Sequence, residues 1–410
     1  MPNLITSLES SPAVGAIPSS PSIPVRPVLS LAVFGRDTRH CGSVLEAGRV
    51  KTTFNARAAL ALALRHAKIG RGDSVLIPAY HCPAMVSPLA WLDIQPVFYP
   101  ICPDTSVDIE ALAHCLKPET RALLAVHYFG FIRDMRLLRA FCDQHGLVLI
   151  EDCAHAFFGN IDGQALGGQG DYAIASVMKF LPIDQGGCLV SAKHSLEDIE
   201  TRPGGIFAQL KSAVNTVEFA CEYGRLPWIK WILQAKDWVW GRLKPRPLNL
   251  AAAHQATETC MEEGGSPEDY IFDPRQFGIR MPWTALAIMR TMSFSRACAR
   301  RRANYLRLLA ALRDIPGARP LFAELPEGAY PQVFPMVMDA PETAFAALKR
   351  KGVPIIRFGE FRWKGVDASL CPVADEYSRR VFQFPCHQSL TDQEISWLIE
   401  AVQAVLKPAE

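Results

Sequence analysis

Hydrophobic and polar positions along the chain predict short buried strands that alternate with helices. From about residue 50 onward, short apolar runs end at glycine, proline or polar turn residues, as buried strands do. The expected strands are Ser74–Ile77, Gln95–Tyr99, Ala122–His127, Leu147–Ile150, Tyr172–Ser176 and Cys188–Ser191. The expected helices are Ala56–Ala67, Pro83–Leu92, Ile109–Leu116 and Met135–His145. This alternation favours an α/β fold with a mostly parallel central sheet sandwiched by helices.

The pattern changes after about residue 200. Residues 200–270 have an irregular, tryptophan-rich pattern with no clear element. Beyond them the pattern predicts helices at Arg296–Leu312, Glu342–Lys351 and Asp392–Leu406, and a strand at Gln332–Met338. We therefore expect a flexible lead-in over residues 1–45, a large domain over 46–270 and a smaller C-terminal α/β domain over 271–410.

Composition excludes several classes of protein. The 410 residues carry a net charge of +2 and show no basic stripe with interleaved aromatics, so a nucleic-acid partner is not expected. The twelve cysteines include no C-x-x-C pair, so neither a zinc site nor any other metal site is expected. No apolar run is long enough to span a membrane, and the Ser- and Pro-rich start lacks a signal-peptide pattern. These features suggest a cytoplasmic protein.

The most informative residue is Lys179. It lies on the loop between two expected strands and is followed by the glycine pair Gly186-Gly187. Upstream, the apolar run that ends at Ile150 leads directly into Glu151 and Asp152. A lysine on a loop and a carboxylate at the end of a strand suit pyridoxal phosphate. The lysine forms a Schiff base with the aldehyde, and the carboxylate keeps the pyridine nitrogen protonated.

Further residues suit the remaining parts of this cofactor. The start of the first helix, at Ala56 and Arg57, is a candidate phosphate cradle, because a helix N-terminus offers unpaired N–H groups. Asn55, just before it, equally suits an ordinary N-cap. Ser176 would add a hydroxyl to the same phosphate. The alternative for Ser176 is a turn residue at the end of a strand.

The two faces of the cofactor ring need their own residues. His155 follows Asp152 by three residues and would pack on the ring or hydrogen-bond its phenolic oxygen, unless it is a satisfied core histidine. A planar side chain for the other face is expected among Tyr80, His81 and Cys82. We favour His81, although the sequence does not decide among the three.

The order of these motifs resembles the DegT family of pyridoxal phosphate enzymes, the fold-type I sugar aminotransferases. The likeness is dense over residues 55–190 and thin between 200 and 270. The residues that carry it are Asn55–Leu60, Gly72–Tyr80, Val126–Gly130, Glu151–Ala156, Gly170-Asp171, Lys179, Gly186-Gly187 and Phe384–Thr391.

The resemblance implies roles for these positions. Lys179 would be the Schiff-base lysine, Asp152 the pyridinium partner and His155 the residue beside the ring. Ser176 and the backbone at Ala56–Arg57 would hold the phosphate. The family implies a homodimer that shares active-site residues, and a reaction that moves an amino group from glutamate to a keto group on a nucleotide-linked sugar. Such reactions belong to polysaccharide or secondary-metabolite biosynthesis.

Some positions depart from the family pattern. Ala56-Arg57 stands where Gly-Thr is usual, and Asp184-Gln185 precedes the glycine pair where Gly-Glu is usual. The motif that reaches across the dimer is reduced to Gly278–Met281. These departures leave the cofactor prediction intact and weaken the prediction of a nucleotide-sugar substrate.

Two alternatives to this function stay open. One is a pyridoxal phosphate enzyme of another reaction type, such as an epimerase or an amino-acid-modifying enzyme. The other is a non-catalytic regulatory relative, against which the complete set of Lys179, Asp152 and His155 argues. In addition, tryptophans and lysines within residues 226–244 suit either a flap over the dimer interface or the substrate cleft, or a peripheral contact with a membrane surface.

Overall fold

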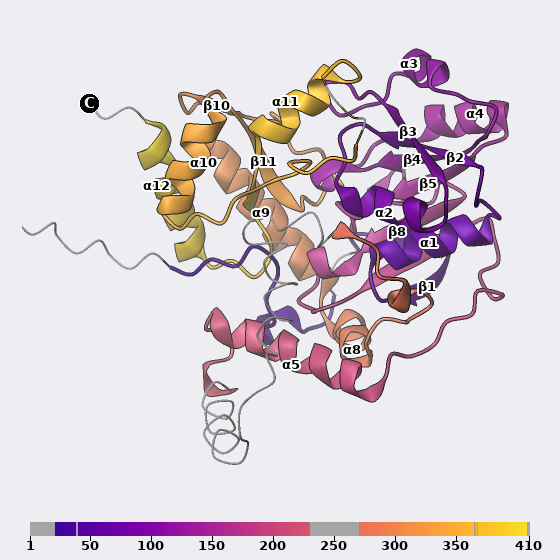
Figure 1. The fold of residues 1–410 in the computed structure, drawn as a ribbon. Coiled ribbons are helices and arrows are strands. Elements are labelled where there is room, and N and C mark those ends of the chain that lie inside the picture. Colours follow the sequence, from indigo (N-terminus) through magenta and orange to yellow (C-terminus); the bar gives the residue numbers. More distant parts are fainter. Residues whose placement is uncertain (1–20, 38–39, 230–269, 365, 367, 408–410) are drawn as a thin grey trace, which may run out of the picture.

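A computed structural model describes residues 21–37, 40–229, 270–364, 366 and 368–407 (Figure 1). A seven-stranded sheet forms the centre of the larger part, in the order β1-β9-β8-β5-β4-β2-β3. Its strands are β1 (Arg49–Thr53), β2 (Ser74–Pro78), β3 (Gln95–Tyr99), β4 (Thr120–Val126), β5 (Val148–Asp152), β8 (Tyr172–Ser176) and β9 (Gly187–Ser191).

The five strands from β8 to β3 run parallel, while β9 and β1 pair antiparallel at one edge. Both faces of the sheet are buried. In β8, Tyr172 and Ile174 lie in the main hydrophobic core, whereas the alternate residues Ala173 and Ala175 lie in a second one. The predicted fold class, a mostly parallel sheet between helices, is confirmed.

The helices of this part form where the sequence supplies start signals. α1 (Ala56–His66) begins after Asn55, whose side-chain oxygen accepts the Ala58 N–H at 2.9 Å. α1 packs on β8 and β9, next to α2, and α4 packs on β5. Other helices here are α2 (Pro83–Trp91), α3 (Ile109–His114) and α4 (Arg136–His145), and β6 (Asn160–Ile161) and β7 (Gln164–Ala165) form a short hairpin.

The C-terminal part is a four-stranded antiparallel sheet in the order β10-β11-β13-β12, with helices around it (Figure 1). Its strands are β10 (Ala318–Pro320), β11 (Val333–Met338), β12 (Ile356–Arg357) and β13 (Val381–Pro385). Its helices are α9 (Phe294–Leu312), α10 (Pro341–Arg350), α11 (Pro372–Arg380) and α12 (Asp392–Leu406). The division of the chain at residue 270 stays a prediction.

The expectation of irregular structure over residues 200–270 is wrong for its first part. α5 (Ile206–Glu222) is a 17-residue helix that packs against α8 (Trp283–Thr291). Its pattern is hard to recognise because exposed apolar residues such as Phe207 interrupt the helical periodicity. Residues 230–269, with most of the predicted membrane-contact segment 226–244, lie outside the described residues.

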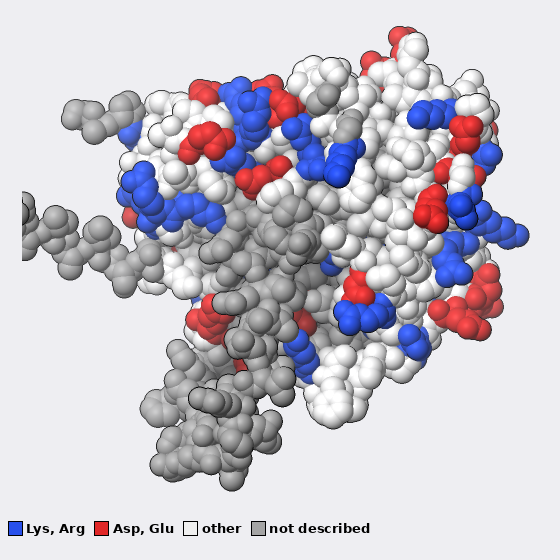
Figure 2. Space-filling model, viewed as in Figure 1, with Lys and Arg blue, Asp and Glu red and all other residues white. Residues whose placement is uncertain are grey.

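The described part of the expected flexible lead-in packs against the body. Val28 is buried and donates its N–H to Ser389 Oγ, and the Pro24 carbonyl accepts a hydrogen bond from His387. Among the described helices, none combines the length and hydrophobicity needed to cross a membrane. On the face shown in Figure 2, basic and acidic side chains are interspersed over the described surface.

Candidate active site

A cavity of about 310 Å³ opens at the carboxyl ends of the parallel strands. Val126 of β4, Asp152 of β5 and Ser176 of β8 line it from the sheet, and residues 356–361 of the C-terminal part line it from the other side. The sheet order reverses between β2 and β4, which places the cavity beside a topological switch point. Ligands of open α/β sheets bind at such points.

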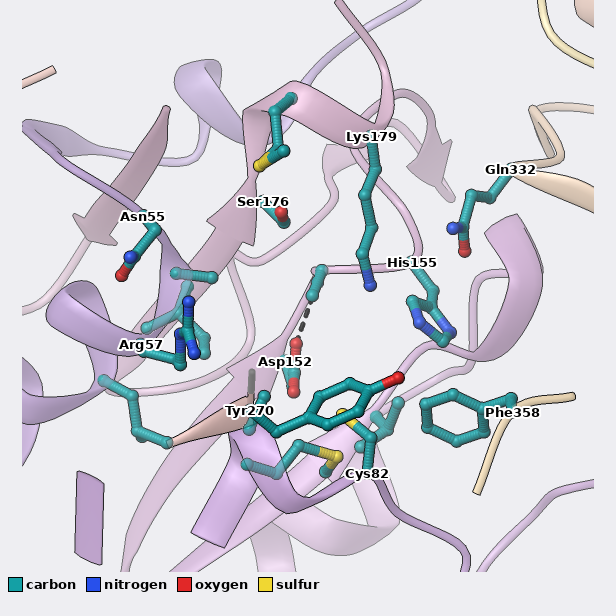
Figure 3. A pocket seen from close by; sticks show the side chains of 18 of the residues that line it. Asn55, Arg57, Cys82, Asp152, His155, Ser176, Lys179, Tyr270, Gln332 and Phe358 are labelled. Atoms are coloured by element: carbon teal, nitrogen blue, oxygen red, sulfur yellow. Dashed lines mark hydrogen bonds between the residues drawn. The ribbon is translucent and has the colours of Figure 1, made fainter. Parts of the chain in front are cut away.

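Lys179 enters this cavity from a tight loop (Figure 3). The loop begins with η4 (Val177–Lys179), directly after β8, and closes where the Gly186 carbonyl accepts the Val177 N–H at 3.0 Å. Gly187 must be glycine because a Cβ there would lie 2.3 Å from the carbonyl carbon of Asn55. The Gly-Gly pair therefore both closes the lysine loop and lets β9 approach the start of α1.

Asp152 faces Lys179 from the end of β5 (Figure 3). One carboxylate oxygen accepts the Ala154 N–H at 2.8 Å, and the Asp152 backbone carbonyl accepts the His127 N–H at 3.1 Å. His127 is itself fixed, since Nε2 lies 3.0 Å from Glu151 Oε2 and Nδ1 accepts the Arg133 N–H. This buried network determines where the Asp152 carboxylate points.

Burial and neighbouring charge shift the pKa values of the groups in the cavity. Burial raises the pKa of Asp152, while the Ala154 N–H and the Lys179 charge oppose the rise. Burial lowers the pKa of Lys179, and the charge of Arg57 adds to this effect, while Cys82 and Asp152 oppose it. Burial also holds the pKa of His155 well below its ordinary value, so its imidazole is neutral. Lowered lysine pKa values suit a group that exchanges protons near neutral pH.

One end of the cavity suits a phosphate. The N–H groups of Ala56 and Arg57 belong to the first turn of α1 and have no acceptor within the helix. Ser176 lines the cavity next to them, because its strand neighbour Gly187 packs on the start of α1. The Arg57 guanidinium donates to the Ile271 carbonyl at 2.9 Å, and Asn55 donates to Gln276 at 2.6 Å. Asn55 thus serves as the N-cap and is tied to the 270–276 segment.

At the other end of the cavity, one buried polar atom has no hydrogen-bond partner. Nδ1 of His155 is buried and has no hydrogen-bond partner, although its ring stacks on Phe129 at 5.7 Å between centroids and lines the cavity. Such atoms are costly unless a ligand satisfies them. An amine, a buried carboxylate, an unsatisfied imidazole nitrogen and a helix N-terminus all face one cavity, and together they fit pyridoxal phosphate.

The structure does not place His81 in the cavity. Its Nδ1 bonds with the Ala79 carbonyl, its Nε2 accepts the Trp363 N–H, and its ring stacks on Phe98 at 4.8 Å. Tyr80 is also buried elsewhere, whereas Cys82 lines the cavity. Of the three alternatives, Cys82 is therefore the one that remains a candidate for the ring face.

Several cavity residues carry no recognisable sequence signal. Tyr270, Gln332 and Phe358 line the cavity from segments distant in sequence from Lys179 (Figure 3). Arg357 also lines it, but its guanidinium forms two hydrogen bonds with Glu342, at 3.0 and 3.1 Å. Only the tertiary arrangement brings these side chains to the site.

The comparison with known families agrees with this geometry. Residues 39–202 match the model of the DegT/DnrJ/EryC1/StrS aminotransferase family. This segment, which is less than half of the chain, is similar to that family. It contains the lysine loop, Asp152, His155 and the start of α1, so the family segment supplies most of the cavity. The resemblance noted from the motifs is confirmed.

Curated relatives match about a third of this chain. One is an L-glutamine:2-deoxy-scyllo-inosose aminotransferase of Streptomyces kanamyceticus, 35% identical over 33% of this chain and 32% of its own length. Another is the GDP-perosamine synthase of Vibrio cholerae, 34% identical over 38% of this chain and 43% of its own length. The matches thus span less than half of these relatives.

Solved structures of aminotransferases share the fold over most of the chain. The aminotransferase TlmJ from Streptoalloteichus hindustanus has a TM-score of 0.59 at 20% identity, covering 87% of this chain and 85% of its own. DesV of S. venezuelae, solved with a ketimine intermediate, has a TM-score of 0.58 at 18% identity and covers 90% and 87%. The likeness in fold therefore includes the C-terminal part of this chain.

Proposed function

We propose that this protein is a pyridoxal phosphate-dependent aminotransferase. It moves an amino group from an amino acid, glutamate in the first instance, to the keto group of a sugar, in polysaccharide or secondary-metabolite biosynthesis. The named relatives act on a cyclitol ketone and make a nucleotide-linked amino sugar, so both kinds of acceptor are candidates. The observation that carries the proposal is that Lys179 and Asp152 line one cavity in a segment of the aminotransferase family.

Each residue has a distinct task in this proposal. When bound, pyridoxal phosphate supplies an electron sink for the substrate carbon. Lys179 holds the cofactor aldehyde and, when released, moves a proton to and from the substrate carbon. Asp152 holds a proton at the ring nitrogen, and His155 offers its unsatisfied Nδ1 beside the ring.

The phosphate end has its own set of residues. The Ala56 and Arg57 N–H groups and the Ser176 hydroxyl bind the phosphate, and the Arg57 side chain adds positive charge to this end. Burial lowers the pKa of Lys179, and the positive charge of the Arg57 guanidinium adds to this lowering. A bound dianion would offset that repulsion.

The test is the first half of the reaction. Glutamate or glutamine should convert the yellow protein to its pyridoxamine form, with loss of the visible absorption band. The Lys179→Ala variant, treated in the same way, should not convert. A wild-type protein whose spectrum does not change with either amino acid, or with a wider amino-acid panel, would contradict the proposal.

We also propose a homodimer, a division near residue 270 and a cytoplasmic location. Exposed apolar side chains on α5 and the start of α8 support an oligomer, since Phe207 is 85% exposed and Trp283 is 53% exposed. Light scattering that compares the molecular mass of Phe207→Glu with that of wild type tests whether this face forms the dimer. Cysteines such as Cys142, Cys188 and Cys298 lie buried in the apolar cores, which supports the cytoplasmic location. The membrane contact through 226–244 stays a prediction.

A further inference from the structure

Gln332 carries a second unsatisfied atom in the cavity. Its amide oxygen Oε1 is buried and has no hydrogen-bond partner, although its side chain lines the same cavity as Lys179 and His155. Figure 3 shows the amide on the side of the cavity where these two residues lie. The resemblance assigned no role to this residue, and it comes from outside the family segment, directly before β11.

The position of Gln332 is fixed relative to Lys179. The Gln332 N–H donates to the Phe129 carbonyl at 2.9 Å, and the Gln332 carbonyl accepts from Arg301 at 3.2 Å. The same Arg301 guanidinium donates to the Lys179 carbonyl at 3.1 Å. The Arg301 guanidinium therefore holds the backbones of both residues, and the Gln332 amide lies at a fixed position beside the Lys179 amine.

The chemistry of the unsatisfied atom limits what it binds. An amide oxygen accepts a hydrogen bond, so the ligand must supply a proton donor. In an amino-acid donor, the reacting carbon carries the amino group, which the cofactor takes, and a carboxylate, which has no proton to give. A ketone of the sugar or cyclitol class instead carries hydroxyl groups on the carbons next to the carbonyl.

We infer that Gln332 is a specificity-determining residue, whose amide oxygen accepts a hydrogen bond from a hydroxyl group adjacent to the keto group of the amino acceptor. The inference rests on the proposed function and narrows its substrate class to hydroxylated ketones. Gln332 acts on the acceptor half of the reaction and leaves the amino-donor half unaffected.

The test compares two ring ketones that differ in their hydroxyl groups. The pyridoxamine form of the wild-type protein, of Gln332→Met and of Gln144→Met is mixed with scyllo-inosose or with cyclohexanone, and kcat/KM is measured for each. Met keeps the length of the side chain and removes the acceptor, and Gln144 is an exposed control on α4. Wild type and Gln144→Met should prefer scyllo-inosose, and Gln332→Met should lower this preference by about 10- to 100-fold, as expected for a lost buried polar contact.

Two further measurements separate specificity from structure. The conversion of the cofactor by the amino donor should stay within about twofold of wild type in Gln332→Met, and its cofactor affinity should not change. Its melting temperature without substrate should be equal or higher, because replacing an unsatisfied buried oxygen removes a cost. A structural role would instead lower the melting temperature.

The outcomes are distinguishable. A wild-type protein that no amino donor converts would end the proposed function itself. A protein with a normal donor half-reaction would overturn only the inference in either of two cases. In the first, wild type does not prefer scyllo-inosose. In the second, Gln332→Met keeps the preference or slows both half-reactions equally.

Discussion

The Arg301 guanidinium donates to the backbone carbonyl of Lys179 at 3.1 Å, from a side chain that is fully buried. It also donates to the carbonyls of Pro331 and Gln332 and to the Gln388 side chain, and it lies over the Phe180 ring. Burial lowers the pKa of Arg301 to about 10, so the group stays a cation at neutral pH. α9 thus ties the lysine loop to the C-terminal sheet.

Arg301→Lys should destabilise the protein and loosen the lysine loop. A lysine keeps the charge, but its compact head cannot reach the carbonyls that the planar guanidinium spans, and it leaves buried acceptors unsatisfied. We expect a loss of about 2–4 kcal/mol in stability and weaker cofactor binding. Thermal melting and cofactor titration measure both. Arg302→Lys is the matched control, since Arg302 donates to the Pro326 and Ala329 carbonyls and not to the lysine loop. Equal effects would contradict this account.

Asp152→Asn should impair the cofactor's function more than the fold. The amide cannot hold a proton at the ring nitrogen, so the donor half-reaction should slow by at least about 100-fold, and cofactor affinity should fall by about tenfold. Stopped-flow absorbance measures the rate of the donor half-reaction, and titration measures the cofactor affinity. Asp314→Asn, on an exposed loop, should behave as wild type. A near-normal half-reaction in Asp152→Asn would exclude this residue as the ring partner.

Gly187→Ala should displace the phosphate cradle. The added Cβ would lie 2.3 Å from the carbonyl carbon of Asn55 and 2.6 Å from the Ala56 nitrogen, so β9 or the start of α1 must move. We expect about 1–3 kcal/mol of destabilisation and at least a tenfold loss of cofactor affinity. Gly70→Ala adds a Cβ with no heavy atom within 4 Å and serves as the control. Unchanged affinity in Gly187→Ala would place the phosphate elsewhere.

Acid should destabilise the protein in part through His387. Burial lowers the pKa of His387 from 6.5 to about 3, and its Nδ1 accepts the Ser389 N–H while Nε2 faces the Pro24 carbonyl. Between pH 6.5 and 3 the unfolded chain therefore binds a proton that the folded chain does not. The contribution of His387 to the free energy of unfolding is fully present above pH 6.5. Below pH 6.5 it falls by about 1.4 kcal/mol per pH unit.

Melting temperatures at pH 7 and pH 5 test this dependence. The drop between the two should be smaller in His387→Gln than in wild type, because the glutamine does not titrate. His145→Gln, on the exposed end of α4, should keep the full drop. Equal drops in all three proteins would show that His387 titrates normally in the folded state.

The sequence predicted the structure best where a local hydrophobic pattern and a chemically distinctive residue occur together. β3 and β8 have the predicted bounds, and Asp152 lies at the end of β5, because buried strands and their ends leave a clear hydrophobic signature. His81 was misplaced because the chain turns into α2 after Ala79, which buries Tyr80 and His81 and leaves Cys82 at the cavity. Gln332 and Arg301 had no local signal, since only tertiary contacts bring them to Lys179.

The central claim is that Lys179 holds the cofactor. Borohydride reduction of the purified yellow protein, followed by protease digestion and peptide mass spectrometry, tests it most directly. We predict a single modified peptide, heavier by the reduced cofactor, with the added mass on Lys179. A cofactor-loaded protein whose adduct lies on another lysine, or that gives no adduct after reduction, would contradict the account.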